Sequence, residues 1–253
     1  MTFSTIPMIF LVEVAAISFA AQSAMRRGVL SRPDVRWISV LIGLLVSWGA
    51  AAVYLGINGA FQSDKFVSIW GPLWLPFVPV ALIVLPMALL PQVRLAVTRL
   101  IDGTPLPALI SIHGLRILAI GGVVKGWNGE FSAPMAGFIG VPDFLFGVSA
   151  LIMAWLAFKQ RVGTWAAVAW NAIGVTIIVP NVLIVTGLSM PGPWQLFSAE
   201  PTIMTLFAFP MVLAPALVVP VFVMMNMFVA ARLIERWFEA RIAGSREELC
   251  SAI

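Results

Sequence analysis

Charged residues are scarce in this chain of 253 residues. Asp, Glu, Lys and Arg together make up 10% of the sequence, whereas hydrophobic residues make up 61%. An ordinary soluble domain is about 25% charged and roughly 45–50% apolar. So few charged side chains cannot cover the surface of a water-soluble fold. The composition therefore predicts a membrane protein and excludes a soluble enzyme, a nucleic-acid-binding domain and a disordered regulator.

Cysteine and histidine occur once each, as Cys250 and His113. A single cysteine excludes an intrachain disulfide, a CxxC redox pair and a thiolate metal cage. A single histidine excludes bis-histidine haem ligation and gives only weak support for zinc. We therefore expect no metal site, and the sequence identifies no cofactor.

Several catalytic and nucleotide-binding motifs are missing as well. The chain has no Walker loop, no GxGxxG, no HExxH and no GxSxG pattern, so it lacks the usual support for these activities. Residues 205–231 contain no lysine that could form a retinal Schiff base, which excludes a rhodopsin. No residue is therefore predicted to be catalytic.

What the chain does have is a series of long hydrophobic runs. A helix needs about 20 apolar residues to cross roughly 30 Å of hydrocarbon. Seven runs meet this requirement, at about 5–25, 37–59, 69–91, 105–125, 141–159, 165–189 and 205–231. We expect an all-α polytopic membrane bundle of seven transmembrane helices, forming one transmembrane domain over 1–253.

The distribution of basic residues predicts the orientation of this bundle. Of the 15 Lys and Arg residues, 12 lie in the first, third and fifth connections and in the tail after the last run. The positive-inside rule then places the N-terminus outside and the C-terminus in the cytoplasm. Residues 232–253 form a cytoplasmic amphipathic tail in this interpretation. Because topology explains the net charge of +4, no nucleic-acid partner is expected, and the predicted location is a bacterial inner membrane.

Polar residues inside the hydrophobic runs are the candidates for function, because ionisable groups in hydrocarbon are costly and usually face the bundle interior. Arg116 lies within the fourth run, three residues after His113 and on the same helix face. Asp143 lies about 4 Å inside the expected outer end of the fifth run. The predicted ligand-binding residues are Arg116, His113, Asp143, Glu13, Asn181, Asn171 and Trp127.

Each of these residues also has a structural interpretation. Arg116 can receive the carboxylate or phosphate of a ligand, or it can form a static ion pair with Glu13 or Asp143. The sequence does not choose between these two partners. His113 can pack in the core through hydrogen bonds, or it can relay protons with Glu13. We expect Glu13, Arg116, Asn181 and Asp143 to converge in the outer half of the bundle.

Several short motifs between residues 110 and 232 resemble a group of uncharacterised bacterial seven-helix membrane proteins. The motifs are His113 to Arg116, Val141-Pro142-Asp143-Phe144, Trp170-Asn171, the loop from Pro191 to Phe197, Glu200-Pro201, and Phe209-Pro210 with Pro215 and Pro220. In that group an arginine, an aspartate, a Trp-Asn pair and a PxPxQ-like loop recur, which implies importance for Arg116, Asp143, Trp170 with Asn171, and Pro191, Pro193 and Gln195. Asn226 stands where the group often has a histidine, and the group supplies no substrate.

Three functions follow as hypotheses. The first is a membrane protein that binds or transports a small polar or anionic ligand through an outward-facing pocket around Arg116. The second is a non-catalytic membrane subunit or scaffold, whose kinked helices and tail dock a membrane protein partner. The third is a membrane enzyme acting on a lipid-like substrate, with His113 and a carboxylate as acid and base.

Overall fold

The computed structural model describes residues 4–68 and 72–251, which are helices joined by short connections, with no strand among them. The longer helices are α1 (Ile6–Arg26), α2 (Arg32–Ile57), α4 (Phe77–Leu89), α5 (Pro91–Asp102), α9 (Val141–Phe158), α10 (Thr164–Thr176), α11 (Val179–Ser189) and α12 (Val219–Ser251). The shorter ones are η1 (Ala60–Gln62), α3 (Asp64–Ser68), η2 (Pro72–Trp74), α6 (Leu106–Ser111), η3 (Ile112–Ala119), α7 (Ile120–Trp127), α8 (Ala133–Met135), η4 (Ala136–Gly140), η5 (Ile203–Phe207) and η6 (Ala214–Val218).

Six helical stretches in the described residues are long and apolar enough to cross a membrane, and a seventh exists only if a bent pair counts as one span. The six are Ile6–Arg26, Arg32–Ile57, Leu106–Trp127, Ala133–Phe158, Thr164–Ser189 and Ala214–Ala243. This confirms an all-helical membrane protein. The second span begins earlier than predicted because Ser31 and Asp34 form a capping box around the start of α2.

The predicted third span, 69–91, is wrong in its extent. Residues 69–71 lie outside the described part of the chain, and the helix that follows, α4, has 13 residues, about 20 Å. A break then bends the chain by 110° into α5. Leu90, at φ −120° and ψ 102°, precedes Pro91, and a residue before proline is driven out of the helical region. The proline therefore ends α4 and opens α5.

The predicted seventh span, 205–231, also needs correction. Its first residues form the 3₁₀ turn η5 and a connection through Pro210, and the span itself begins at Ala214. It opens with η6, a π-helical turn that contains Pro215. The indole Nε1 of Trp48 donates a hydrogen bond of 2.8 Å to the Ala216 carbonyl within this turn, which fixes η6 against α2.

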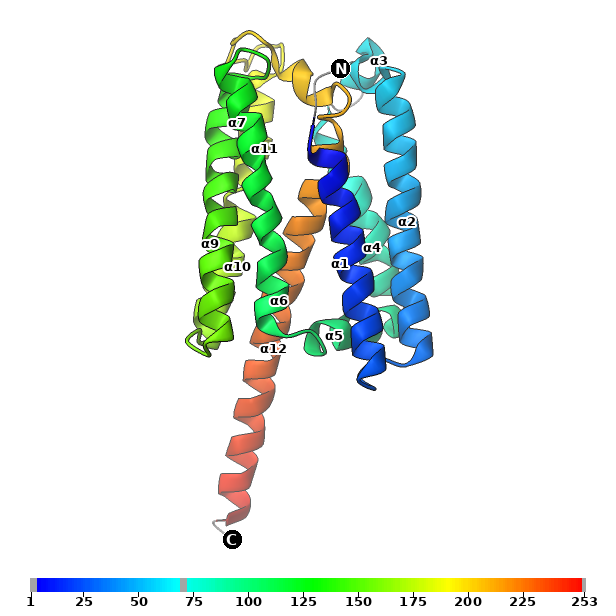
Figure 1. The fold of residues 1–253 in the computed structure, drawn as a ribbon, viewed down its shortest axis with the longest axis vertical. Coiled ribbons are helices and arrows are strands. Elements are labelled where there is room, and N and C mark those ends of the chain that lie inside the picture. The colour runs from blue at the N-terminus through cyan, green and yellow to red at the C-terminus, as the bar shows by residue number, and fades with distance from the viewer. Residues whose placement is uncertain (1–3, 69–71, 252–253) are drawn as a thin grey trace.

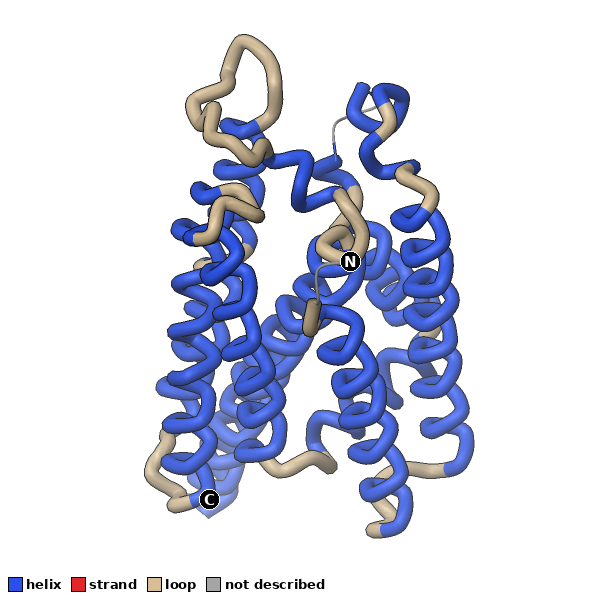
Figure 2. Tube along the Cα trace, turned by 45° about the horizontal axis from the view of Figure 1, so that its top comes forward, coloured by secondary structure: helices blue, strands red, loops and turns tan. Residues whose placement is uncertain are grey.

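The helices form two groups, with α12 between them (Figure 1). One group contains α1, α2 and α4, and the other contains α6–η3–α7, α9, α10 and α11. Helix α12 packs against α10 on one side and against α4 on the other. The connections lie at the two ends of the bundle (Figure 2). The start of α1 and the end of α12 lie at opposite ends, and α12 projects well beyond its neighbours.

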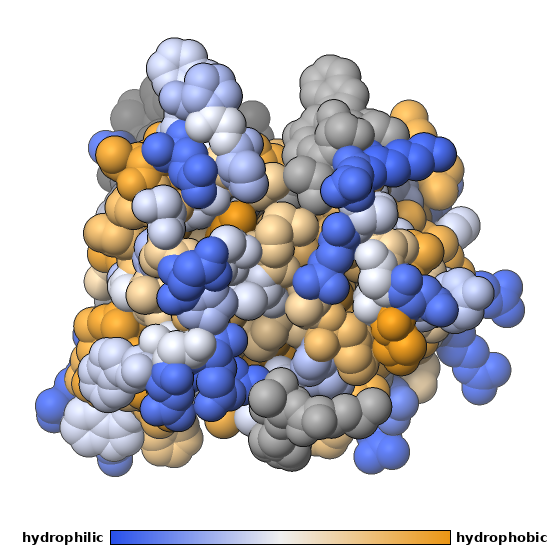
Figure 3. All heavy atoms as spheres, turned by 90° about the horizontal axis from the view of Figure 1, so that it is seen from above, coloured by the Kyte–Doolittle hydropathy of each residue, from blue (hydrophilic) through white to orange (hydrophobic). Residues whose placement is uncertain are grey.

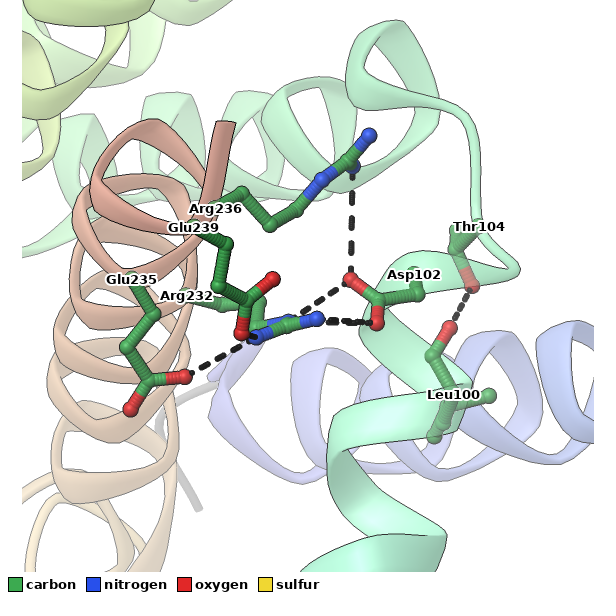
Figure 4. Close-up of polar contacts among 7 residues, drawn as sticks. All are labelled: Leu100, Asp102, Thr104, Arg232, Glu235, Arg236 and Glu239. Carbon is green, nitrogen blue, oxygen red and sulfur yellow. Dashed lines mark hydrogen bonds and ion pairs between the residues drawn. The ribbon is translucent and has the colours of Figure 1, made fainter. Parts of the chain in front are cut away.

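An ion-pair network joins α5 to α12 at the end of the bundle from which α12 projects (Figure 4). Arg232 donates to both carboxylate oxygens of Asp102, with Nε–Oδ1 and Nη2–Oδ2 distances of 2.9 Å. Its Nη1 also lies 3.2 Å from Glu235 and 3.1 Å from Glu239. Arg236 approaches the same aspartate at 4.0 Å. The network fixes the bent helix α5 against the point where α12 leaves the bundle.

The opposite end of the molecule shows hydrophilic side chains scattered among hydrophobic ones (Figure 3). Polar side chains at both ends, with long apolar helices between them, are the arrangement expected of a chain that crosses a hydrocarbon layer.

Candidate functional site

The candidate site is built on a distorted stretch in the middle of the span 106–127. Residues 112–119 form a 3₁₀ helix, η3, between the α-helical ends of the span. Runs of 3₁₀ helix this long are uncommon, and residues three apart in them lie directly above one another. His113 and Arg116 therefore share one face, and their exposed fractions are 1% and 2%.

Arg116 pairs with Asp143 on α9, through a hydrogen bond from Nε to Oδ1. Its two terminal nitrogens form long hydrogen bonds of 3.5 and 3.4 Å to the Gly174 carbonyl on α10. The guanidinium carbon lies 4.2 Å from the ring centre of Phe146 and 5.9 Å from that of Phe222, both within cation–π range. The structure thus selects Asp143, and not Glu13, as the ionic partner.

A close approach of two backbones makes this pair possible. A Cβ atom added at Gly147 would lie 2.4 Å from the Ile117 nitrogen and 2.7 Å from the Arg116 carbonyl carbon. Only glycine allows α9 to lie this close to η3. Asp143 precedes Gly147 by one helical turn and so faces Arg116 directly.

Asp143 lies deeper in the fifth span than the sequence predicts. The helical stretch begins at Ala133 and not at 141, because α8 and the π-helical turn η4 precede α9. Asp143 therefore lies ten residues inside the span, about 15 Å from its start, and not about 4 Å. This depth brings the carboxylate level with Arg116.

His113 lies in an aromatic enclosure. Its ring centre is 6.1 Å from that of Phe146, 5.7 Å from that of Trp170 and 5.5 Å from that of Phe222. Phe146 and Trp170 stack on each other at 4.4 Å, and the Trp170 indole donates to Ser149 Oγ. Neither imidazole nitrogen has a hydrogen-bond partner in the described structure.

Glu13 is completely buried on α1, and neither of its carboxylate oxygens has a hydrogen-bond partner among the described residues. It follows Ile9 by one turn, on the face of α1 that packs against Val218 and Phe222. Leu115 and Leu118 of the span 106–127 join the same cluster. Glu13 therefore lies beside the Phe222 side of the site, but it forms no ion pair with Arg116.

Asn226 is a member of the site that the list of predicted ligand-binding residues omits. It is 0% exposed, and neither its amide nitrogen nor its amide oxygen has a hydrogen-bond partner in the part of the chain described. A Cβ atom added at Gly174 would lie 2.6 Å from its Nδ2, so Asn226 lies against the glycine whose carbonyl accepts from Arg116. A lone polar residue within the apolar run 217–229 is the signal that marks it.

The remaining predicted residues lie in different surroundings. Asn171 is buried one turn before Gly174, and its amide donates to the Ala167 carbonyl at 2.9 Å. Asn181 is half-buried and donates to the Ile177 carbonyl, with no contact to Arg116, so the structure does not show the expected convergence on this residue. Trp127, at the end of α7, is 84% exposed and does not cover the site.

The arrangement offers charge and hydrogen-bonding capacity, but no metal cage. Among the described residues, no three His, Cys, Asp or Glu side chains gather closely enough to hold a metal ion. Seven buried polar atoms have no hydrogen-bond partner among those residues: two each on Glu13, His113 and Asn226, and Ser189 Oγ. His113 shares the η3 face of Arg116, and Asn226 lies against Gly174, whose carbonyl accepts from Arg116. Glu13 lies on the neighbouring helix α1. Chemically, the site can exchange protons at two positions and hold an anion at a third.

Comparison of the chain with protein-family models, with curated proteins and with solved structures finds no match. The resemblance to the bacterial seven-helix group therefore stays a prediction, and the fold and site define the protein only as a polytopic helical membrane protein with a buried polar cluster.

Proposed function

We propose that this protein binds or transports a small polar or anionic ligand at the cluster formed by Glu13, His113, Arg116, Asp143 and Asn226. The observation that carries the proposal is the set of four buried polar atoms without partners on His113 and Asn226 beside the Arg116–Asp143 ion pair, with two more on Glu13 of the neighbouring helix α1. Buried polar groups in proteins are nearly always hydrogen-bonded. Ionisable groups inside a membrane bundle mark functional sites by default, and groups without an internal partner are free to bind a ligand.

The chemistry of exchange follows from the guanidinium. Arg116 holds one carboxylate oxygen of Asp143 and makes only long bonds to Gly174. A ligand carboxylate or phosphate forms two parallel hydrogen bonds to a guanidinium and can replace Asp143 there. Asp143 and Glu13 can then carry protons, which keeps the net charge of the cluster low. Asn226 and His113 supply neutral donors and acceptors for the rest of the ligand.

Access to the cluster requires helices to move, because Arg116 is enclosed in this conformation. Arg116 does not line the cavity between α1, η3 and α12 that is described in the next subsection. It does not line the shallower cavity beside α4 either. Three local distortions support such motion: the 3₁₀ stretch η3 and the π-helical turns η4 and η6. Distortions of this kind are frequent at functional sites. η4 and η6 lie toward the end where α1 begins, which favours opening at that end.

The orientation is part of the proposal. The end of α1, the start of α2, α5 and the end of α9 gather at one end of the bundle (Figure 1), and these elements and their connections carry eight of the 15 basic residues. By the positive-inside rule this end faces the cytoplasm. The site then opens outward, in a bacterial inner membrane, with seven crossings if α4 and α5 together count as one.

A second candidate, a subunit that docks a membrane protein partner, is favoured by one observation. Helix α12 continues beyond the other helices and exposes Phe238 and Ile242, at 53% and 58%. Apolar side chains on a projecting helix are typical of a contact with another helix or with the membrane surface.

The experiment that tests the first proposal compares ligand-dependent thermal stabilisation of the purified protein in detergent. The probes are inorganic phosphate and a set of small mono- and dicarboxylates. The test variant is Arg116→Gln/Asp143→Asn, which removes the guanidinium without leaving a buried charge unpaired. The control is Arg94→Gln, an exposed arginine on α5.

We expect at least one probe to raise the melting temperature of the wild-type protein and of Arg94→Gln but not of the double variant. Equal stabilisation of all three proteins contradicts the proposal. If no probe stabilises the wild type while Phe238→Ser/Ile242→Ser abolishes capture of a membrane partner, the second candidate replaces the first.

A further inference from the structure

A cavity of about 700 Å³ lies on the other side of η3 from the buried cluster. Gly114 and Leu115 line it, whereas His113 and Arg116 do not. Its other walls come from α1, α2, α4, α5, α6, α9 and α12. The cavity is therefore separate from the proposed site, and its volume falls within the roughly 300–1,000 Å³ that is usual for ligand pockets.

The walls of this cavity are apolar and its rim opens sideways. Val12, Phe19 and Leu151 line it and are nevertheless 38%, 73% and 52% exposed. All three lie within candidate membrane spans, so their exposed surfaces face hydrocarbon in a bilayer. What reaches the cavity from that side is a lipid acyl chain and not a water-soluble ligand.

One end of the cavity is polar. Ser23, Arg27 and Thr104 lie there, at the end of α1 and just after α5. The Arg27 guanidinium donates to Ser23 Oγ and to the Gly103 carbonyl, at 2.6 Å in the second case. No carboxylate lies within ion-pair distance of it in the residues that the structure describes.

We propose that this cavity binds an anionic membrane lipid, with an acyl chain between α1, η3 and α12 and the phosphate of the headgroup on Arg27. The guanidinium has the geometry for bidentate phosphate binding, and basic pockets between membrane helices are typical sites for anionic headgroups. An acyl chain leaves one apolar environment for another when it enters, so chain burial gives little preference. Selectivity therefore comes from the headgroup charge at Arg27.

The experiment measures the lipids retained by the full-length protein after purification in detergent, and the melting temperature after addition of lipid. The probes are phosphatidylglycerol and phosphatidylcholine with identical chains, and inorganic phosphate without a chain. Arg27→Gln tests the headgroup contact, with Arg26→Gln as its control on the same turn. Ala20→Trp fills the cavity, and Ala15→Trp places the same bulk on a surface of α1 outside it.

We expect phosphatidylglycerol to co-purify with the wild type and to stabilise it, whereas phosphatidylcholine does not, and the response to inorganic phosphate is the same in Arg27→Gln as in the wild type. Arg27→Gln lowers the preference for phosphatidylglycerol over phosphatidylcholine about tenfold, as expected for the loss of one charge-assisted contact. Ala20→Trp retains less of either lipid, and both control variants behave as the wild type.

Equal retention of both lipids, or equal behaviour of Ala20→Trp and Ala15→Trp, overturns the proposal. A second outcome also overturns the proposal: the wild type is a dimer, and Ala20→Trp makes it monomeric without changing the lipid content. In that case the cavity binds a second copy of the chain. None of these outcomes depends on Arg116, so the two proposals fail or succeed separately.

Discussion

At the scale of single residues, the close contact at Gly147 sets the geometry of the buried ion pair. We expect Gly147→Ala to push α9 away from η3, because both atoms that its Cβ meets are backbone atoms that cannot rotate aside. Overpacking of this kind costs about 1–3 kcal/mol. Thermal unfolding in detergent measures the loss. Gly121→Ala on α7 is the control, since nothing lies within 4 Å of a Cβ atom there, and an equal melting temperature for both variants contradicts the model of close packing.

The ion pair itself gives a second prediction at this scale. Asp143→Asn leaves the Arg116 charge buried without its partner, and breaking such pairs destabilises proteins by about 3–5 kcal/mol. We expect the double variant Arg116→Gln/Asp143→Asn to be more stable than the sum of the two single variants predicts. Denaturant unfolding of the four proteins measures the coupling. Additive effects indicate that the two side chains do not act as a pair.

The sequence predicts part of this site and misses the rest for physical reasons. Residues three apart lie on one face of both an α-helix and a 3₁₀ helix, so the shared face of His113 and Arg116 is predictable. The choice of Asp143 over Glu13 depends on where each span begins, and η4 shifts that start by several residues without a clear sequence signal. Asn226 is visible as a polar residue in an apolar run, but its contact with Gly174 is a tertiary one.

At the scale of elements, Asp102 links the bent helix α5 to α12. We expect Asp102→Asn to weaken the pairing with Arg232 by about 1 kcal/mol, because the two side chains are only partly buried. Hydrogen exchange of the α5 amides then accelerates. Glu130→Gln, an exposed residue at the other end of the bundle, is the control and leaves α5 unchanged. Unchanged exchange in Asp102→Asn shows that other contacts hold α5, among them the Arg99–Asp34 ion pair to α2.

The bend before α5 shows where element prediction stops. The hydrophobic run continues through residues 69–91. The sequence of α4 is apolar enough for a membrane span, although its 13 residues are too few to form one alone. What limits α4 is backbone geometry, because Leu90 and Pro91 end it and the turn η2 delays its start. The other spans are predictable to within a few residues at most ends, since caps and charged residues flank them. The starts of the fifth and seventh spans, and the 3₁₀ geometry in the middle of the fourth, are not.

At the scale of the whole molecule, the orientation and the crossing by α4 are testable together. The chain has a single cysteine, Cys250, so new cysteines can be introduced one at a time after it is replaced by serine. We expect a membrane-impermeant maleimide to label Gln62→Cys and Asn128→Cys in intact cells. Arg94→Cys, and Cys250 in the native chain, react only after permeabilisation. Labelling of Arg94→Cys and Gln62→Cys from the same side shows that α4 does not cross.

Helix α12 has a mechanical consequence. It runs without a break from the residues beside the buried cluster to the far end of the chain, and Ser251 lies 25 residues, about 37 Å, beyond Asn226. A rigid rod of this length acts as a lever arm. A tilt of about 5° around Asn226 displaces its far end by about 3 Å. A rearrangement around Arg116 that tilted α12 would therefore be larger at the projecting end of the helix, and the Arg232–Asp102 ion pair to α5 opposes such a tilt.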